Sequence, residues 1–251
     1  MRGVRMQTNL LQRNPDINWL FDVSKASGLS PCVAFRASKY VTYLSAERAG
    51  RRVVSRCNRL FYDIKNSGST QKSMVSPFVY HCLFISIKIE TQEWGNNPKI
   101  MQFALHNHFS TSNYTNSAEF SKILMTADFE ISMAMDWNMI PVSPFHYLQE
   151  LFDNRCFYLL NDAIELCTHA IVYEMNVPCA RTLACAAVVA TGSIRGGVAC
   201  KTSLVRGLNC LVLLSSTPSA FDAVDYSVVL STSQNLEELY VKINNRVKRK
   251  L

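Results

Sequence analysis

Apolar residues recur along this chain at intervals of three or four positions, the spacing of one face of an α-helix. Strictly alternating segments, which would favour β-strands, are scarce, and only the segment 224–232 is ambiguous. The pattern therefore predicts an all-α protein. The expected helices cover residues 16–27, 31–45, 47–65, 77–91, 98–108, 117–137, 144–153, 156–175, 178–191, 201–215, 219–231 and 235–249.

Three Ser-Pro pairs mark expected helix starts. Ser30-Pro31, Ser76-Pro77 and Ser143-Pro144 each precede an apolar-periodic segment. A serine oxygen at the N-cap accepts a hydrogen bond from a first-turn N–H, and proline suits the first helical position. The same pairs also fit proline-directed kinases, but the periodicity that follows them favours helix starts.

A composition change divides the chain near residue 142. The prolines of 141–144 interrupt the helical pattern, and the sequence beyond them contains less lysine and more alanine, cysteine and valine. With 251 residues, of which 48% are hydrophobic, the chain can bury a core for one large or two small domains. We expect an N-terminal extension at 1–12, a first helical domain at 13–142 and a second at 143–251 with a basic tail.

The net charge of +7 is concentrated in two places. Arginines recur at helical spacing along 47–65, opposite apolar residues, so this segment predicts an amphipathic helix with a basic face. That face is either simply solvated or contacts nucleic acid or an acidic partner. A second basic cluster occupies 246–250, and no recognised DNA-reading motif accompanies either cluster. The candidate basic partner surface consists of Arg48, Arg52, Arg56 and Arg59.

Motifs for catalysis, metal binding and membrane insertion are lacking. The nine cysteines are odd in number and form no C-x-x-C, so we expect reduced, mostly buried thiols. Phosphate-binding loops and nucleophile elbows are missing, which disfavours an enzyme, and no metal or cofactor is expected. The pattern predicts neither a signal peptide nor a membrane span.

Several short segments resemble the cyclin box. Trp19, followed by Leu29-Ser30-Pro31, is similar to the first two helices of that family, in which a tryptophan precedes a leucine-serine-proline turn. Arg13 falls where the family has an arginine. The segment Asp136-Trp137-Asn138, with prolines after it, matches the end of the fifth helix and its turn. The resemblance covers about residues 13–153.

The resemblance implies a two-domain cyclin fold and a kinase-binding site. Lys88 falls on the lysine that closes the third helix of a cyclin box and contacts the kinase. Nine positions before Trp137, where cyclins have a paired glutamate, this chain has Asp128, which is one methylene shorter; Glu130 is the alternative partner. The implied kinase-binding residues are Lys88, Asp128 and Glu130, and the implied structural residues are Arg13, Trp19 and Trp137.

Departures from the cell-cycle cyclins indicate which group of cyclin-like proteins the chain resembles most. About twenty extra residues lie between Ser45 and Lys88, and the substrate-docking patch is mostly absent because Gln12, Pro15 and Asp16 replace apolar residues. The chain looks most like the cyclin N-terminal-domain-containing and crossover-site-associated meiotic cyclin-like proteins. That resemblance implies a nuclear, chromosome-associated regulatory protein that promotes meiotic crossover formation with recombination proteins and a cyclin-dependent kinase.

Two alternatives stay open. One is a viral or transcription-type cyclin that activates a cyclin-dependent kinase. The other is a scaffold that binds recombination proteins or DNA through the arginines and no longer binds a kinase. Lys88 favours a kinase-binding protein, whereas aspartate instead of glutamate at position 128 favours the scaffold.

Overall fold

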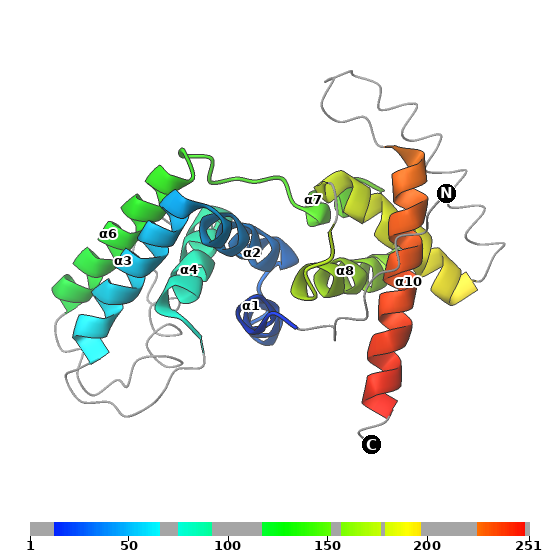
Figure 1. The fold of residues 1–251 in the computed structure, drawn as a ribbon, viewed down its shortest axis with the longest axis horizontal. Coiled ribbons are helices and arrows are strands. Elements are labelled where there is room, and N and C mark those ends of the chain that lie inside the picture. The colour runs from blue at the N-terminus through cyan, green and yellow to red at the C-terminus, as the bar shows by residue number, and fades with distance from the viewer. Residues whose placement is uncertain are drawn as a thin grey trace. The chain divides into compact units, whose positions relative to one another are not determined.

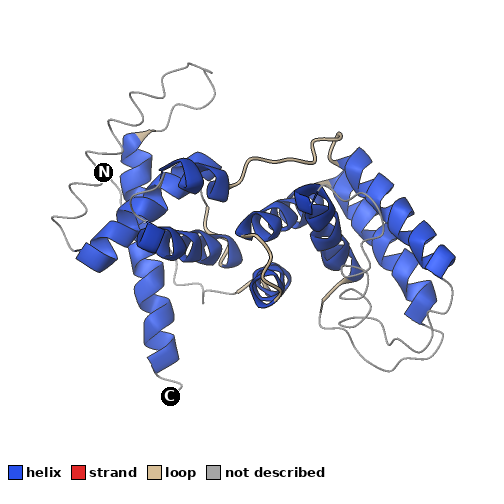
Figure 2. Ribbon diagram, turned by 180° about the vertical axis from the view of Figure 1, so that it is seen from behind, coloured by secondary structure: helices blue, strands red, loops and turns tan. Residues whose placement is uncertain are grey.

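A computed structural model describes residues 13–65, 75–91, 117–151, 157–176, 179–196 and 225–248. Regular secondary structure within these ranges is entirely helical (Figure 2), which confirms the all-α prediction. The expected helices at 98–108 and 201–215 lie outside the described residues. Contacts divide the chain into two compact units, Pro15–Pro141 and Val142–Leu251, the second of which includes Arg13 and Asn14.

The first unit is built around one buried helix (Figure 1). Its helix α4 packs against each of the other four described helices of the unit. Residues 78–88 of α4 are all buried, as expected for a helix that is apolar on every side. The helices of this unit are α1 (Pro15–Ala26), α2 (Pro31–Ala46), α3 (Arg48–Lys65), α4 (Pro77–Thr91) and α6 (Ser117–Ala134).

Polar contacts fix the register of α2 against α4. The buried Arg36 of α2 donates to the carbonyl oxygen of Ser86, over 3.1 Å, and forms an ion pair with Glu90 at 3.2 Å. The Ser86 hydroxyl donates to the carbonyl oxygen of Val33 over 2.8 Å. Because a buried charge is stable only when it is paired and hydrogen-bonded, these contacts favour a single alignment of the two helices.

All three Ser-Pro pairs begin helices, as the sequence predicted. Helices α2, α4 and α7 (Pro144–Leu151) start at their prolines. Ser30 shows the capping contact directly, since its hydroxyl oxygen accepts from the backbone N–H of Cys32 over 3.3 Å.

In the part of the second unit that the structure describes, the helices are α7, α8 (Phe157–Val172), a helix over 180–196 and α10 (Tyr226–Lys248). Helix α8 contacts both α7 and α10. Residues 182–192 are all buried, and their small side chains suit close helix packing. The Arg195 guanidinium holds the Asp162 carboxylate of α8 through two contacts of 2.7 and 3.0 Å.

The prediction of two C-terminal helices, 219–231 and 235–249, was wrong where it placed a break. Helix α10 runs without interruption through this position. The hydroxyl groups of Ser231 and Ser233 donate to the carbonyl oxygens of Val228 and Leu230, over 3.0 and 2.9 Å, so these polar residues are accommodated inside the helix. The ambiguous segment 224–232 is helical from Tyr226 onward.

Most described cysteines are buried free thiols, as predicted. Burial raises the pKa of Cys57 to about 12 and that of Cys185 to about 11, so both thiols are protonated and unreactive at neutral pH. Cys179 departs from the prediction because it is exposed. The other buried thiols are Cys32, Cys82 and Cys167. Among the described helices, none combines the length and apolar composition that crossing a bilayer requires.

Candidate functional site

An ion pair joins α4 to α6. The Lys88 ammonium lies 2.6 Å from Oδ2 of Asp128, and its Nζ lies 4.5 Å from the centre of the Phe84 ring. Only 9% of the Lys88 side chain is exposed, so the ring and the carboxylate replace much of the solvent around the charge. The structure thus brings together the lysine and the aspartate that the sequence analysis paired.

His81 is a third member of this cluster, and the sequence analysis missed it. Its Nε2 lies 2.7 Å from Oδ1 of Asp128, and its side chain is completely buried. His81 precedes Lys88 by seven residues, which is two helical turns, so both side chains lie on one face of α4. That spacing was the available signal in the sequence.

The Asp128 carboxylate stays charged at neutral pH. Burial acts to raise its pKa, but hydrogen bonds and charge from His81 and then from Lys88 outweigh burial and lower the pKa below the ordinary value of 3.8. The cluster is therefore an ionic link between two helices.

Glu130 points to a different helix. Its two carboxylate oxygens lie 3.1 and 3.2 Å from Nη1 of Arg56 on α3. Two residues of helix correspond to about 200° of rotation, so Asp128 and Glu130 lie on opposite flanks of α6. Asp128 is thus the acid that reaches Lys88.

Helix α6 and the turn that follows it carry an exposed apolar stripe between these flanks. Phe129 and Trp137 are 57% and 61% exposed, and their rings meet edge to face with centroids 6.0 Å apart. Exposed apolar patches of this kind mark interaction sites. The sequence analysis gave Trp137 a structural role and did not identify the stripe, although its four-residue spacing was visible. We define the α6 apolar face as Met125, Phe129, Met133 and Trp137.

The sequence predicted helix as far as Trp137, but α6 ends at Ala134. Asp136 and Trp137 have φ values of 50° and 59°, in the left-handed region that a helix cannot contain. The Trp137 N–H donates to the carbonyl oxygen of Ser132 over 2.9 Å and closes the turn. The Tyr40 hydroxyl donates to the carbonyl oxygen of Met139, which ties the following residues to α2.

The other residues implied by the resemblance lie elsewhere. Trp19 is half-buried on α1, and its ring packs on Tyr80 of α4 with centroids 5.8 Å apart. Arg13 is exposed and groups with the second unit.

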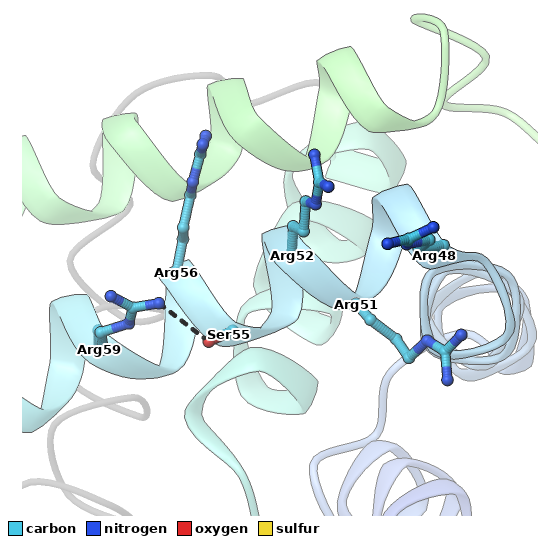
Figure 3. Close-up of a pocket in the computed structure, with 6 residues that line it drawn as sticks. All are labelled: Arg48, Arg51, Arg52, Ser55, Arg56 and Arg59. Carbon is cyan, nitrogen blue, oxygen red and sulfur yellow. Dashed lines mark hydrogen bonds between the residues drawn. The ribbon is translucent and has the colours of Figure 1, made fainter.

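The four predicted surface arginines are all exposed along α3 (Figure 3). Arg52 and Arg56 point toward α6, and Arg51, a fifth arginine of the same predicted basic helix, points away from it. Helices α3 and α6 lie side by side, so the arginines and the α6 apolar face occupy neighbouring helices.

Comparisons with protein-family models, curated proteins and solved structures found no match to this chain. The cyclin family therefore stays a prediction from the sequence. Within the described residues, no group of three or more histidine, cysteine, aspartate and glutamate side chains is placed to hold a metal ion.

Proposed function

We propose that this chain is a cyclin-like regulatory protein that binds and activates a cyclin-dependent kinase through α4 and α6. The observation that carries the proposal is the contact of 2.6 Å between Lys88 and Asp128. It joins the two positions at which the resemblance expects a lysine and its acidic partner. In this mechanism, the regulatory protein packs rigidly against the kinase's mobile regulatory helix and moves a catalytic glutamate of the kinase into its active position. The regulatory protein itself supplies no catalytic group.

The α6 apolar face supports the proposal. Methionine and aromatic residues are enriched where proteins bind one another, and methionine adapts its shape to the partner. Met125 precedes Asp128 by three residues, so the apolar face adjoins the flank that holds the ion pair. Fully burying an exposed phenylalanine or methionine contributes about 1.5–3 kcal/mol, which makes this face a suitable anchor for a partner helix.

Burial limits how much Lys88 itself can contact a kinase. With 9% of its side chain exposed, Lys88 offers a partner little surface. Its main role in the proposal is to hold α4 and α6 in a fixed arrangement, while the α6 apolar face makes most of the contact.

The cellular setting is proposed from the sequence resemblance. In this proposal, the protein acts in the nucleus, at meiotic recombination sites, and promotes crossover formation. A second candidate function is a scaffold for recombination proteins that binds no kinase. The burial of Lys88 and the exposure of the α3 arginines favour that candidate.

Kinase activation in a purified system tests the proposal. A panel of cyclin-dependent kinases would be assayed for phosphorylation of a peptide substrate with and without the chain. We expect at least one kinase to be stimulated, and we expect Phe129→Ala with Met133→Ala to abolish the stimulation. Tyr43→Ala, which removes an exposed aromatic side chain from α2, is the matched control and should stimulate normally. Stimulation that survives the double substitution would refute the assignment of the surface.

A further inference from the structure

The outer face of α3 is strongly basic. We define the α3 basic face as the arginines that surround Ser55 in Figure 3, and all of them are exposed. Between Arg48 and Arg59 the sequence contains no acidic residue. The face consists of Arg48, Arg51, Arg52, Arg56 and Arg59.

This arrangement of charge disfavours the helix that carries it. Arg48 is the first residue of α3, and the first turn contains no acid, so a positive charge lies at the positive end of the helix dipole, offset in part by Glu47 just before the helix. Arg52 lies four residues from both Arg48 and Arg56, a spacing at which like charges repel. A ligand that neutralises these charges would therefore stabilise α3.

Contacts with the other described residues neutralise little of this charge. Among the described residues, Glu130 is the carboxylate that contacts the basic face, and it binds only Arg56. The Arg59 guanidinium donates to the Ser55 hydroxyl over 3.3 Å, which orients the guanidinium without reducing its charge.

The chemistry of the lining indicates the kind of ligand. Among the described side chains, only those of arginine and serine line the face, and none of them is apolar or aromatic. A protein partner normally inserts an apolar or aromatic anchor, and single-stranded nucleic acid stacks its bases on aromatic rings. A face made of guanidinium groups suits phosphate oxygens, which these groups bind in bidentate fashion. Carboxylates are bound in the same way, so an acidic protein is the alternative that the experiment must separate.

We propose that the α3 basic face binds the phosphate backbone of duplex nucleic acid without reading base sequence. From Arg48 to Arg59, α3 rises about 16 Å, and this length of B-form duplex carries about five phosphates on each strand. The residues involved differ from those of the α6 apolar face. The inference therefore stands or fails independently of kinase binding.

Fluorescence anisotropy with the full chain tests the inference. The probes are two DNA duplexes of unrelated sequence and one RNA duplex, each of about 20 base pairs, with a polyglutamate peptide as the acidic competitor. We expect similar affinity for the two DNA sequences. We also expect the logarithm of the association constant to fall with the logarithm of salt concentration, with a slope of about −3 to −5 for DNA. Binding to either type of duplex supports the inference, and comparing them identifies the preferred nucleic acid.

Three double variants locate the binding surface. Arg52→Glu with Arg59→Glu should weaken duplex binding at least tenfold, because about two phosphate contacts are lost. Lys25→Glu with Lys39→Glu changes the net charge equally at exposed positions on α1 and α2, and should bind like the wild type. Arg56 is left intact because it pairs with Glu130. Arg52→Lys with Arg59→Lys retains the charge and should retain most of the affinity.

Three results would overturn the inference. The first is the absence of duplex binding by the wild type at about 50 mM salt. The second is an equal loss of affinity in the lysine control, which would indicate attraction by net charge alone. The third is tighter binding to polyglutamate than to either duplex, which would indicate an acidic protein as the ligand. Far-UV circular dichroism of every variant must match the wild type, and Arg52→Ala with Arg59→Ala provides a second test without charge reversal.

Discussion

The cluster of His81, Lys88 and Asp128 places charge inside an otherwise apolar contact between α4 and α6. Removing charged groups from water is costly, and attraction between them offsets that cost only when the geometry is good. The contacts of 2.6 and 2.7 Å use both oxygens of Asp128, so the carboxylate is well matched. The loss of any one member is therefore costly.

Removing the acid should destabilise the protein more than removing both charges. We expect Asp128→Ala to lower the free energy of unfolding by about 2–4 kcal/mol, because it leaves the Lys88 charge buried without its partner. Adding Lys88→Met, which preserves volume without the charge, should recover at least about 1 kcal/mol. Urea denaturation measures both effects. A loss below about 0.5 kcal/mol for Asp128→Ala would mean that the ion pair contributes nothing.

The same carboxylate gives stability a defined dependence on pH. The pKa of Asp128 in the folded chain lies below its ordinary value of 3.8, so its contribution is complete above that value and is lost as the pH falls through the folded pKa. The difference in unfolding free energy between the wild type and Asp128→Asn should therefore be largest near neutral pH and shrink below about pH 4. A difference that grows on acidification would contradict the contacts described.

Trp137 offers a way to separate stability from binding. Its φ of 59° favours glycine, and its ring is mostly exposed. Trp137→Gly should therefore change the melting temperature by only a few degrees, because relief of backbone strain offsets the added flexibility of the unfolded chain. Kinase binding should nevertheless weaken, since the α6 apolar face loses its largest side chain. Unchanged affinity would exclude Trp137 from the interface.

At the scale of single helices, the junction of α2 and α3 determines where the basic face lies. Helix α2 ends at Ala46 and α3 begins at Arg48, so only Glu47 lies between them. The Glu47 N–H donates to the carbonyl oxygen of Tyr43 over 3.3 Å. Gly50 makes this close approach possible. A Cβ atom at Gly50 would lie 2.6 Å from Cα of Leu44, which is too close for any non-bonded contact.

Gly50→Ala should therefore destabilise the first unit by about 1–3 kcal/mol, because backbone atoms would have to move. Gly28→Ala is the matched control for the chemical change. Gly28 has a φ of 65° but open space around it, so its substitution should cost only about 1–2 kcal/mol through backbone conformation. Thermal denaturation followed by circular dichroism compares the variants. A Gly50→Ala variant as stable as the wild type would show that α2 and α3 are farther apart than described.

Local signals in the sequence predicted most of the described helices. Serine followed by proline determined the starts of α2, α4 and α7, because capping depends on neighbouring residues alone. The end of α6 was missed because the residue types at Asp136 and Trp137 do not predict the left-handed backbone conformation that ends the helix there. The break expected within α10 was wrong because serine hydroxyl groups can bond to carbonyls of their own helix.

The candidate site was predictable only in part. The resemblance to the cyclin box paired Lys88 with an acid but left Asp128 and Glu130 as alternatives, because only packing decides which flank of α6 faces α4. His81 was missed because the sequence does not distinguish a histidine that contacts an acid from any other buried polar residue of an apolar helix. The α6 apolar face was missed because exposure depends on which neighbours a helix acquires, and four-residue apolar spacing also describes a buried face.

At the scale of the whole chain, the two compact units have separate cores. Helix α4, the centre of the first unit, finds its major helix contacts inside that unit. We therefore expect residues 13–141, expressed alone, to give a helical circular dichroism spectrum and one cooperative thermal transition. A non-cooperative transition would show that the first unit needs the second to fold.

The first unit also contains both proposed surfaces, the α3 basic face and the α6 apolar face. If both proposals hold, one helical unit binds a kinase on one helix and a duplex backbone on its neighbour. Such a protein would bring a kinase to nucleic acid, which agrees with the chromosomal role expected from the sequence.

The most direct test of kinase binding is a calorimetric titration of the purified chain with the cyclin-dependent kinase that it stimulates most. We predict a saturable one-to-one binding curve for the wild type and for Tyr43→Ala. For Phe129→Ala with Met133→Ala, affinity should fall at least tenfold, since about 1.4 kcal/mol corresponds to a factor of ten. No binding by the wild type to any kinase of the panel, or equal affinity of the double variant, would contradict the account.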